Sequence, residues 1–498
     1  MRLAVGAARS RLVIQMLTES ITLSTIGAAV GLPLAWLGIR ALLRFLPNDA
    51  LAPLALDLSP DRRMAGFALI VTVLSGIAFG LAPALRASRQ DLFTVLKRDT
   101  GSARAGSWDF GRMLVCFQIA LSLALLAGAG LFARALANLR AADLGLKRDN
   151  VLFIDTNMVQ SGYSPQQTRR YFETLQQDIQ QLPDVMAASI AVNNPFGYTG
   201  WKERILVEGR DSELYTVDSN AVSPRFFEAM GIPILRGRDF RNSDETAPLQ
   251  DRAAIVNELF AQRFFGGESA IGRRFCLGNK WAAAQTYQIV GVVANARYQS
   301  FESPVAPMIY RPFYRDMQWS GGVLCIRTGG NPKRLIATIR RRTQDIDPVV
   351  MVTEAHTLQD NIDVALLEQR SVATLGGFFA IVALLLAAVG IYGVMSQAVT
   401  RRTREIGIRM ALGAGRVHVL WMMLGNSLVT VLIGITLGLT AAVTLARYAE
   451  PLLFGVKPRD PYTIAGAVLL LLLTAVLAGF LPAHRATRVQ PVAALKHE

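Results

Sequence analysis

The chain alternates long apolar stretches with short polar and basic ones. A helix that crosses a bilayer needs about 20 apolar residues, because the hydrocarbon core is about 30 Å thick. Stretches of this kind lie at 18–45, 64–86, 113–138, 372–398, 418–448 and 461–483. The first and fifth exceed the minimum length and are expected to tilt, kink or extend past the bilayer, and Pro33 is placed to kink the first. The pattern therefore predicts a multi-span α-helical membrane protein with about six transmembrane helices.

Basic residues gather on one side of these spans. Outside the central stretch 139–370, most of them lie in the segments 1–16, 86–112, 399–417 and 484–498. The loops 46–62 and 449–460 carry few cations, and three aspartates crowd the first of them. Because cytoplasmic loops are enriched in Lys and Arg, the four basic segments are predicted to be cytoplasmic. Both termini then lie in the cytoplasm, and the residues between the third and fourth spans lie outside it.

Residues 139–370 have the composition and periodicity of a soluble α+β domain. Its two ends each follow the order strand, helix, strand, and each helix begins with a polar cap and a proline, at Ser164 and Asn331. The predicted strands are 151–158, 185–192, 322–328 and 349–354, and the predicted helices are 164–182 and 331–346. The intervening stretch, about 200–315, is rich in short strands and turns, with short helices expected near 224–230 and 257–265. This order predicts two βαβ halves of a ferredoxin-like sandwich with an inserted second lobe.

Composition and motifs argue against several classes of function. Hydrophobic residues make up 52% of the 498 residues and charged residues only 18%, against about 25% charged residues in soluble domains. The net charge of +15 does not indicate nucleic acid as a partner, because the cations lie at the ends of apolar runs and in the central soluble stretch and do not form one patch. Zinc-protease, serine-hydrolase and CxxC motifs do not occur. Acids such as Asp239 and Asp244 are therefore expected to serve turns, and no catalytic residue is predicted.

The cysteines and histidines give no sign of a metal site. The three cysteines lack metal-ligand or redox spacing, and the four histidines are scattered along the chain. Cys276 and Cys325 both fall in the α+β domain, and the sequence leaves open whether they form a disulfide. No metal site is predicted.

The start of the chain repeats near its end. Arg2, Gly6 and Arg9 match Arg409, Gly413 and Arg416 at a constant offset. In the same register, Gly27 and Gly31 match Gly434 and Gly438, which forms a G-x-x-x-G pattern twice. Small residues at this spacing let transmembrane helices approach closely, so these four glycines are predicted to pack helices together.

A second block also repeats. The sequence PALRASRQDLFTVLK at 83–97 matches PAHRATRVQPVAALK at 482–496. Residues 2–97 and 409–496 are therefore predicted to be two copies of one module with two spans.

Two motifs carry a family resemblance, RTREIGIRMALGA at 402–414 and LPAHRATRVQPVAALK at 481–496. In these motifs and in the order of its spans and domains, the stretch 113–496 resembles the MacB/FtsX-type ABC-transporter permeases. The upstream copy resembles the double-length members of that family, which fuse two such units. Met1 aligns with Ile408 inside the first motif, so the first unit is expected to be incomplete. Either the chain is a fragment with a late assigned start, which is the interpretation we favour, or the first unit has decayed.

The resemblance implies a domain organisation. A partial first permease module occupies 1–97, a cytoplasmic linker 98–112, a transmembrane helix 113–138, a periplasmic MacB-like domain 139–370, and an FtsX-like module 371–498. The expected location is the bacterial inner membrane, with the large domain in the periplasm.

The resemblance also assigns a role to the basic segment 399–417, which in this family couples the membrane spans to an ATPase. On a helix, Val399, Thr403, Ile406 and Met410 fall on one side and the charged residues on another. Glu405 and Arg409 form an i,i+4 pair that adds about 0.2–0.5 kcal/mol. The predicted coupling residues are Arg402, Arg404, Glu405, Ile406, Arg409, Met410 and Gly413. Without the resemblance, the arginines would be interpreted only as topology anchors.

The pattern G-x-x-x-x-G-K-[ST], whose backbone cradles ATP phosphates, does not occur in the sequence. No cofactor is therefore predicted on this chain, and ATP with Mg²⁺ is expected on a partner ABC ATP-binding subunit. The resemblance implies efflux by mechanotransmission, in which closure of that subunit moves the periplasmic domain. Other implied partners are membrane lipid, a second permease half in a homo- or pseudo-dimer, and a periplasmic adaptor or outer-membrane channel. The alternative is a non-transporting, FtsX-like scaffold that signals to a periplasmic partner.

Overall fold

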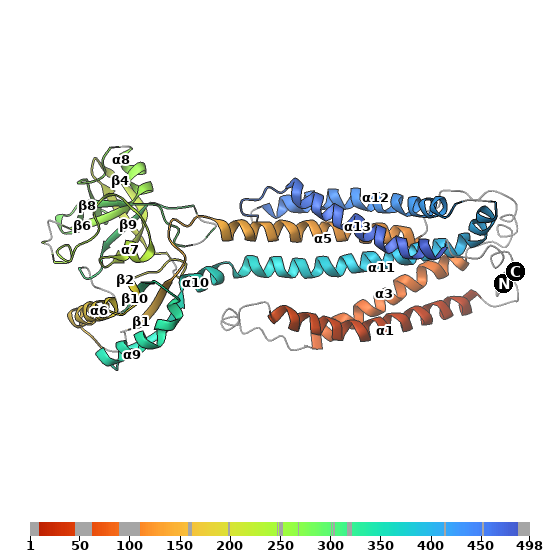
Figure 1. Ribbon diagram of the computed structural model, residues 1–498, viewed down its shortest axis with the longest axis horizontal. Helices are drawn as coiled ribbons and strands as arrows, with labels where there is room; N and C mark the ends of the chain where they lie inside the picture. Colours follow the sequence, from red (N-terminus) through yellow and green to blue (C-terminus); the bar gives the residue numbers. More distant parts are fainter. Residues whose placement is uncertain are drawn as a thin grey trace. The chain divides into compact units, whose positions relative to one another are not determined.

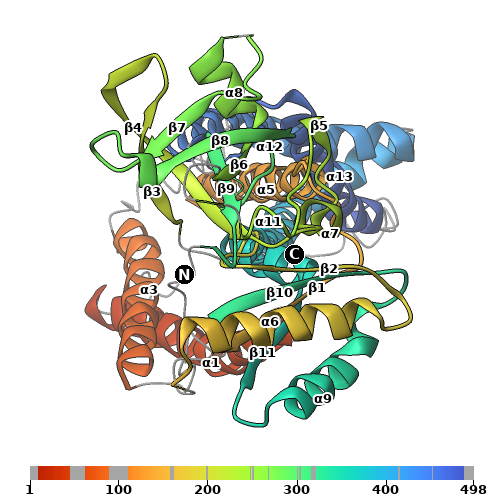
Figure 2. The same ribbon diagram turned by 90° about the vertical axis from the view of Figure 1, so that its left-hand side faces the viewer.

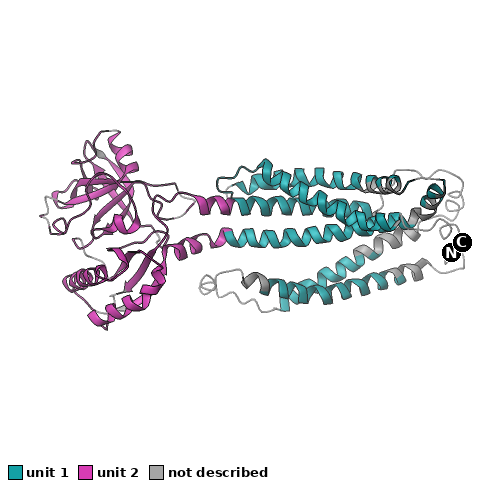
Figure 3. Cartoon of the chain, viewed as in Figure 1, with its two compact units in different colours: residues 1–134, 370–498 teal, residues 135–369 magenta. Residues whose placement is uncertain are grey.

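The computed structural model describes residues 9–44, 62–88, 110–157, 162–197, 200–246, 248, 252–266, 268–299, 301, 304–315, 321–412, 415–450 and 453–486. The chain divides into two compact units (Figure 3). The helical unit comprises Met1–Arg134 and Arg370–Glu498, and the sheet unit comprises Ala135–Gln369. Two helices, α5 (Phe110–Ala141) and α11 (Leu367–Ala411), each contribute residues to both units.

Long apolar helices make up the helical unit (Figure 1). They are α1 (Arg9–Arg44), α3 (Arg62–Ser88), α5, α11, α12 (Arg416–Tyr448) and α13 (Pro461–Ala486). Among the described residues, five segments are long and apolar enough to cross a membrane: Leu17–Arg40, Gly111–Ala141, Leu367–Thr400, Leu428–Tyr448 and Pro461–Arg485. These segments overlap five of the predicted spans. The sixth, 64–86, falls within α3 and stays a prediction, as do the sidedness and both terminal positions.

Helix α5 supplies a large share of the core of the helical unit. It buries a side chain at every fourth position from Val115 to Leu131, and residues four apart lie on the same side of a helix. The first four of these side chains pack into one apolar cluster with residues of three other helices: Ile391 from α11, Val431, Ile435 and Ala442 from α12, and Ala467, Leu471 and Ala475 from α13. Lipid tails are as apolar as these side chains, so close packing, and not exclusion from water, holds such helices together.

Four strands of the sheet unit form an antiparallel sheet with the order β11-β1-β10-β2. These strands are β1 (Val151–Asn157), β2 (Val185–Ala191), β10 (Gly321–Thr328) and β11 (Met351–Thr357). Helices α6 (Pro165–Gln180) and α9 (Ile336–Ile346) lie together on one face (Figure 2). Leu152, Ile154, Phe172, Leu175 and Ile339 are among the side chains buried between the helices and the strands. Two β-strand, helix, β-strand halves joined in this order have ferredoxin-like topology.

The helix starts follow from local sequence. Ser164 caps α6 in a capping box with Gln167, and Pro165 occupies the first helical position. Asn331 caps the short 3₁₀ helix η6 (Pro332–Leu335), whose last residue leads directly into α9. These caps confirm the helix starts predicted from the polar residue and proline pairs.

The insertion between the two halves forms a closed barrel. Its strands pair in the ring β4-β3-β7-β8-β6-β9, and β9 returns to pair with β4. The strands are β3 (Lys202–Val207), β4 (Arg210–Val222), β6 (Ala253–Asn257), β7 (Arg274–Leu277), β8 (Thr286–Val293) and β9 (Met308–Pro312), and β5 (Ile234–Gly237) pairs with β8. Short elements complete the lobe: α7 (Phe226–Met230), α8 (Glu258–Phe265) and the 3₁₀ turn η5 (Ala283–Gln285). The two α-helices of the lobe match the short helices predicted near 224–230 and 257–265. Ring closure leaves the six strands without a free sheet edge, and a free edge is where unwanted strand pairing begins.

Candidate functional site: the coupling segment and its helix bundle

The predicted coupling segment lies at the end of α11, where the helix approaches α12. Figure 1 shows the last turns of α11 bending away from the direction of the span. There, Met395, Ile406 and Ala483 are buried together, with Val399, Met410 and Met422 packed partly buried against them. This cluster joins α11, α12 and α13 at one point. We call it the junction cluster.

The structure tests part of the predicted coupling set. Ile406 is 1% exposed and Met410 partly buried, and both face the junction cluster with Val399, which confirms the apolar side that the sequence predicted. The backbone of Arg402, Arg404 and Glu405 lies in α11, but their side chains and the whole of Gly413 fall outside the described residues. Arg409 is exposed and contacts the Met422 sulfur through its guanidinium group. Contact between these charged residues and an ATPase stays a prediction.

Gly434 and Gly438 of α12 lie directly against α5. A Cβ placed on Gly434 would come within 2.7 Å of Ile119 Cγ2, and one on Gly438 within 2.8 Å of the Ala120 carbonyl oxygen. Carbon atoms in contact prefer about 3.5–4.0 Å, so neither site has room for a side chain. The two glycines therefore pack α12 on α5 as the G-x-x-x-G pattern predicted.

The matching glycines of α1 behave differently. No described atom lies within 4 Å of a Cβ placed on Gly27 or Gly31. The predicted packing role is therefore not seen for these two residues. Helix α1 contacts α3 through another face, where Gly76 of α3 meets Ile21 and Ser24 and Gly80 meets Ser20. The physical reason is that a G-x-x-x-G pattern only permits close approach and does not select the helix that approaches.

The opposite end of the bundle is held by an ion pair. Asp460 precedes α13 and accepts hydrogen bonds from the Thr463 backbone N–H at 2.9 Å and the Thr463 hydroxyl at 2.5 Å. Its carboxylate also pairs with Arg134 of α5, and the Arg134 guanidinium lies 5.5 Å from the centre of the Tyr462 ring. The hydrogen bonds from Thr463, followed by the charge of Arg134, hold the pKa of Asp460 below its usual value. These contacts tie the start of α13 to α5.

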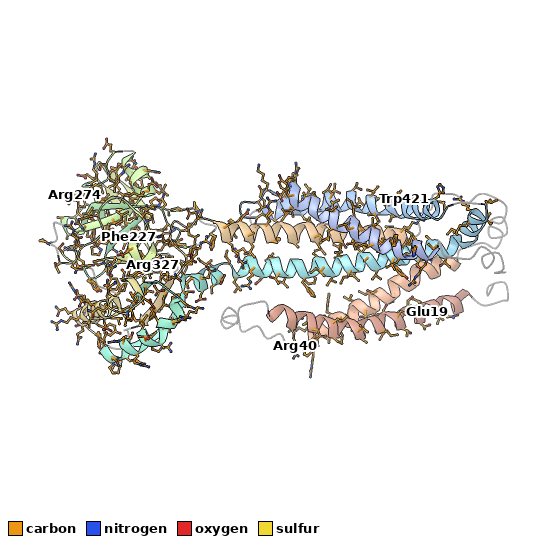
Figure 4. All side chains as sticks on the ribbon, viewed as in Figure 1. Glu19, Arg40, Phe227, Arg274, Arg327 and Trp421 are labelled. Carbon is orange, nitrogen blue, oxygen red and sulfur yellow. The ribbon has the colours of Figure 1, made fainter. Side chains whose placement is uncertain are left out.

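Arg327 is a structural residue that sequence reasoning missed (Figure 4). It extends from β10, and its guanidinium donates to four backbone carbonyls: Lys147 at 3.2 Å, Asp149 at 3.2 Å, Glu228 at 3.3 Å and Ala229 at 2.8 Å. Lys147 and Asp149 belong to the segment between α5 and β1, and the other two belong to α7. Burial lowers the pKa of Arg327 from its usual value. Arg327 thus fixes the segment through which the chain enters the sheet unit. No sequence motif around Arg327 predicts this role.

The acids and cysteines singled out in the sequence have structural roles. Asp244 accepts from Arg238 at 2.6 Å and from the Arg241 backbone N–H at 2.7 Å, and Asp239 accepts from the Phe240 backbone N–H at 2.7 Å. These contacts confirm that both acids serve turns. Cys276 and Cys325 are free, buried thiols, which answers the question that the sequence left open.

One carboxyl group of the sheet unit is held in an unfavourable environment for its charge. Glu245 is 4% exposed. Its Oε2 atom accepts a 2.9 Å hydrogen bond from the Tyr314 backbone N–H, and its Oε1 atom is buried without a hydrogen-bond partner among the described residues. Burial raises the pKa of Glu245 to about 8, against the smaller opposing effects of that N–H and of Arg169.

This raised pKa predicts a pH-dependent stability. The folded chain holds the Glu245 proton more tightly than the unfolded chain, whose reference pKa is 4.5. The contribution of Glu245 to the free energy of unfolding is therefore largest below about pH 4.5 and falls as pH rises to about 8. Glu245→Gln should remove this loss, which is on the order of a few kcal/mol. In thermal unfolding of the detergent-solubilised chain, the variant should match the wild type near pH 5 and melt higher at pH 8. Glu268→Gln, whose native side chain is 71% exposed, is the control; equal pH slopes for the two variants would contradict the prediction.

The arrangement of long apolar helices and a separate sheet unit defines a class, the helical membrane proteins with a folded domain outside the bilayer. Residues 377–491 match the FtsX-like permease C-terminal family, and residues 113–363 match the MacB-like periplasmic core domain. The chain belongs to the MacB/FtsX-type ABC permease family, as its two motifs predicted. It is thus a membrane protein with a periplasmic domain.

Three relatives illustrate the similarity. The macrolide export ATP-binding/permease protein MacB of Wolinella succinogenes is 24% identical over 333 residues, which cover 64% of this chain and 49% of that protein. The pyoverdine export ATP-binding/permease protein PvdT of Pseudomonas putida is 28% identical over 311 residues, 59% and 45% of the two proteins. The uncharacterized ABC transporter permease YknZ of Bacillus subtilis is 26% identical over 297 residues, 56% and 70%. The chain spans about half the length of MacB and PvdT.

Proposed function

We propose that the chain is the permease component of an ABC-type export system and that it works with a separate ATP-binding subunit. The family supports this function, and relatives are named as export ATP-binding/permease proteins. ATP and Mg²⁺ bind to the partner subunit, and this chain supplies no catalytic residue. The complex lies in the bacterial inner membrane with both chain termini in the cytoplasm and contains a second permease half. A periplasmic adaptor or outer-membrane channel receives what is exported.

The proposed mechanism is mechanotransmission, and one observation carries it. Helices α5 and α11 are each continuous from the helical unit into the sheet unit, so a displacement of either helix is transmitted along its backbone. At its other end, α11 is fixed to α12 and α13 by the junction cluster. Movement of the coupling segment by an ATP-binding subunit therefore displaces a packed element and not a free tail.

The two sides of the coupling segment have different roles, one in packing against the bundle and one in binding the partner. Ile406 and Met410 bind the segment to the bundle through the junction cluster. The charged residues Arg402, Arg404, Glu405 and Arg409 bind the ATP-binding subunit, and Gly413 belongs to the same predicted coupling set. An arginine-rich face with one acid favours a partner surface that carries complementary charges.

Residues 2–97 are proposed to repeat the two-span module of residues 409–496. The repeat pairs residues of α1 with residues of α12, such as Gly27 with Gly434, and residues of α3 with residues of α13, such as Arg86 with Arg485. The paired residues lie in corresponding helices, which supports the duplication.

Charge reversal in the coupling segment tests the proposed function. The chain is co-expressed with a candidate ABC ATP-binding subunit, and Glu405→Lys and Arg409→Glu are made separately. Both variants should lose co-purification of the subunit or stimulation of its ATP hydrolysis, because the reversed charge repels the complementary group on the partner. Arg459→Glu, in the loop between α12 and α13, is the control and should retain both. Retention of both properties by the two variants would reject coupling through this segment, and failure of the wild-type chain to bind an ATP-binding subunit would reject the export function itself.

A further inference from the structure

Three potential metal ligands converge on two neighbouring strands of the sheet unit. Strands β1 and β11 are antiparallel neighbours in which Phe153 lies opposite His356 and Asp155 lies opposite Glu354. Residues directly opposite each other, and residues two apart on a strand, share a face of the sheet. Asp155, Glu354 and His356 therefore project from the face opposite Leu152 and Ile154, which belong to the core under α6 and α9.

The ligand atoms have the spacing of a metal site. One atom from each of Asp155, Glu354 and His356 lies within 4.8 Å of the other two. His356 Nδ1 is 3.4 Å from Asp155 Oδ2. Two ligand atoms about 2.1 Å from a tetrahedral Zn²⁺ lie about 3.4 Å apart. The distance between these two atoms therefore equals the distance between two ligand atoms of a tetrahedral Zn²⁺ site.

The same nitrogen has an unused bonding capacity. His356 Nδ1 is buried and makes no hydrogen bond among the described residues, although the Asp155 carboxylate lies near it. A buried polar atom without a partner costs about 1–3 kcal/mol. A cation between Nδ1 and the carboxylates would satisfy it.

The charges of Asp155 and Glu354 also favour a bound cation. Asp155 and Glu354 are carboxylates directly opposite each other on adjacent strands, an arrangement of like charges that is normally destabilising. A divalent cation shared by the two groups would reverse the sign of that interaction. A β-bulge between Asp155 and Thr156 interrupts the pairing beside Glu354, and the Thr353 hydroxyl donates to the Asp155 carbonyl oxygen at 3.0 Å. Bulges of this kind redirect neighbouring side chains.

Contacts other than those of Nδ1 also fix the orientation of the His356 imidazole. Its Nε2 atom lies 3.0 Å from the Asn194 Nδ2 atom, and Asn194 is 4% exposed. Phe153 packs against the ring with the centres 5.7 Å apart. A metal on Nδ1 requires the ring proton on Nε2, and the Asn194 amide, turned over by 180°, then presents its carbonyl oxygen to that N–H and fixes the tautomer.

We propose that Asp155, Glu354 and His356 form a Zn²⁺ site with three protein ligands and one position open to water. One imidazole with two carboxylates is a donor set that zinc accepts, and three protein ligands with an open fourth position is a known zinc arrangement. The ion cross-links β1 to β11. Along the chain, β1 follows α5 and β11 leads through α10 (Leu358–Ala365) into α11. Zinc would thus stiffen the two strands that connect to the shared helices. The site itself does not depend on the proposed function.

A metal titration of the full chain tests the site. The chain is purified in detergent without a polyhistidine tag, stripped with chelator and titrated with Co²⁺, whose visible absorption reports tetrahedral coordination. We expect saturable absorption in the wild type and loss of that absorption when Zn²⁺ is added. His356→Gln and Glu354→Gln should each weaken Co²⁺ binding by more than about tenfold. Asp345→Asn, which removes an exposed carboxylate of α9, should bind as the wild type does.

The possible outcomes separate the site from simpler explanations. Absence of saturable binding in the wild type means that the cluster is only a histidine and aspartate ion pair, and this overturns the proposal. Equal binding by all four proteins means adventitious metal only, which overturns it as well. Because Glu354 is exposed, Glu354→Gln should keep the wild-type thermal midpoint in chelator, so a loss of binding in that variant reports the site and not unfolding.

Discussion

Replacing Gly438 with leucine is expected to disrupt the helix bundle, whereas the same replacement at the matching Gly31 is expected to be tolerated. At Gly438 the new side chain would meet the backbone of Ala120 on α5, with its carbonyl oxygen 2.8 Å and its Cα 2.9 Å from the Cβ. Backbone atoms cannot change rotamer, so α12 must move away from α5. We expect a loss of about 3 kcal/mol or more, at the upper end of the usual cost of overpacking.

The measurement is the thermal midpoint of the detergent-solubilised chain, with Gly434→Leu and Gly27→Leu as a second matched pair. Leucine is a good helix former, so intrinsic helix propensity favours all four variants equally and cannot explain a difference. The α12 variants should unfold at clearly lower temperature than the α1 variants. Equal midpoints for the two pairs would show that the contact between α12 and α5 does not control the stability of the bundle.

The sequence predicts most elements of the sheet unit because their signals are local. Ser164 and Asn331 cap helices that are followed by apolar periodicity, and neither signal depends on distant residues. The closed barrel was not predicted, since its closure depends on the parallel pairing of β4 with β9, in which Asp218 lies beside Met308. Pairing between strands so far apart in the chain leaves no pattern in either strand.

In the candidate sites, too, only the features that depend on local sequence could be predicted. The apolar side of the coupling segment could be predicted, because the spacing of Val399, Ile406 and Met410 is a property of one helix. The cluster of Asp155, Glu354 and His356 could not be predicted. Its members lie on strands about two hundred residues apart, and the histidines look scattered until the register of β1 and β11 is known. The prediction of no metal site rests on the spacing of residues along the chain, which does not show which strands lie side by side.

The junction cluster gives the second large prediction. Ile406 is 1% exposed and Ile408 is 44% exposed, although the two isoleucines are neighbours on the same turn of α11. Ile406→Asp buries an unpaired charge among Met395 and Ala483, which costs several kcal/mol or releases the segment from the bundle. Ile408→Asp makes the same chemical change at an exposed position and should alter packing little. Neither variant removes the charged residues that are proposed to bind the ATP-binding subunit.

In the proposed mechanism, movement of the coupling segment reaches the sheet unit. The most direct measurement is the distance between spin labels at Arg274→Cys in β7 and Arg341→Cys in α9, two exposed positions in different lobes. The three native cysteines are buried and should remain unlabelled. In a reconstituted complex with the ATP-binding subunit, we expect a nucleotide-dependent distance for the wild type and Ile408→Asp. We expect a constant distance for Ile406→Asp, with the subunit still bound. A distance that stays constant in the wild type during ATP hydrolysis, or that changes equally in Ile406→Asp, would rule out mechanotransmission through the coupling segment.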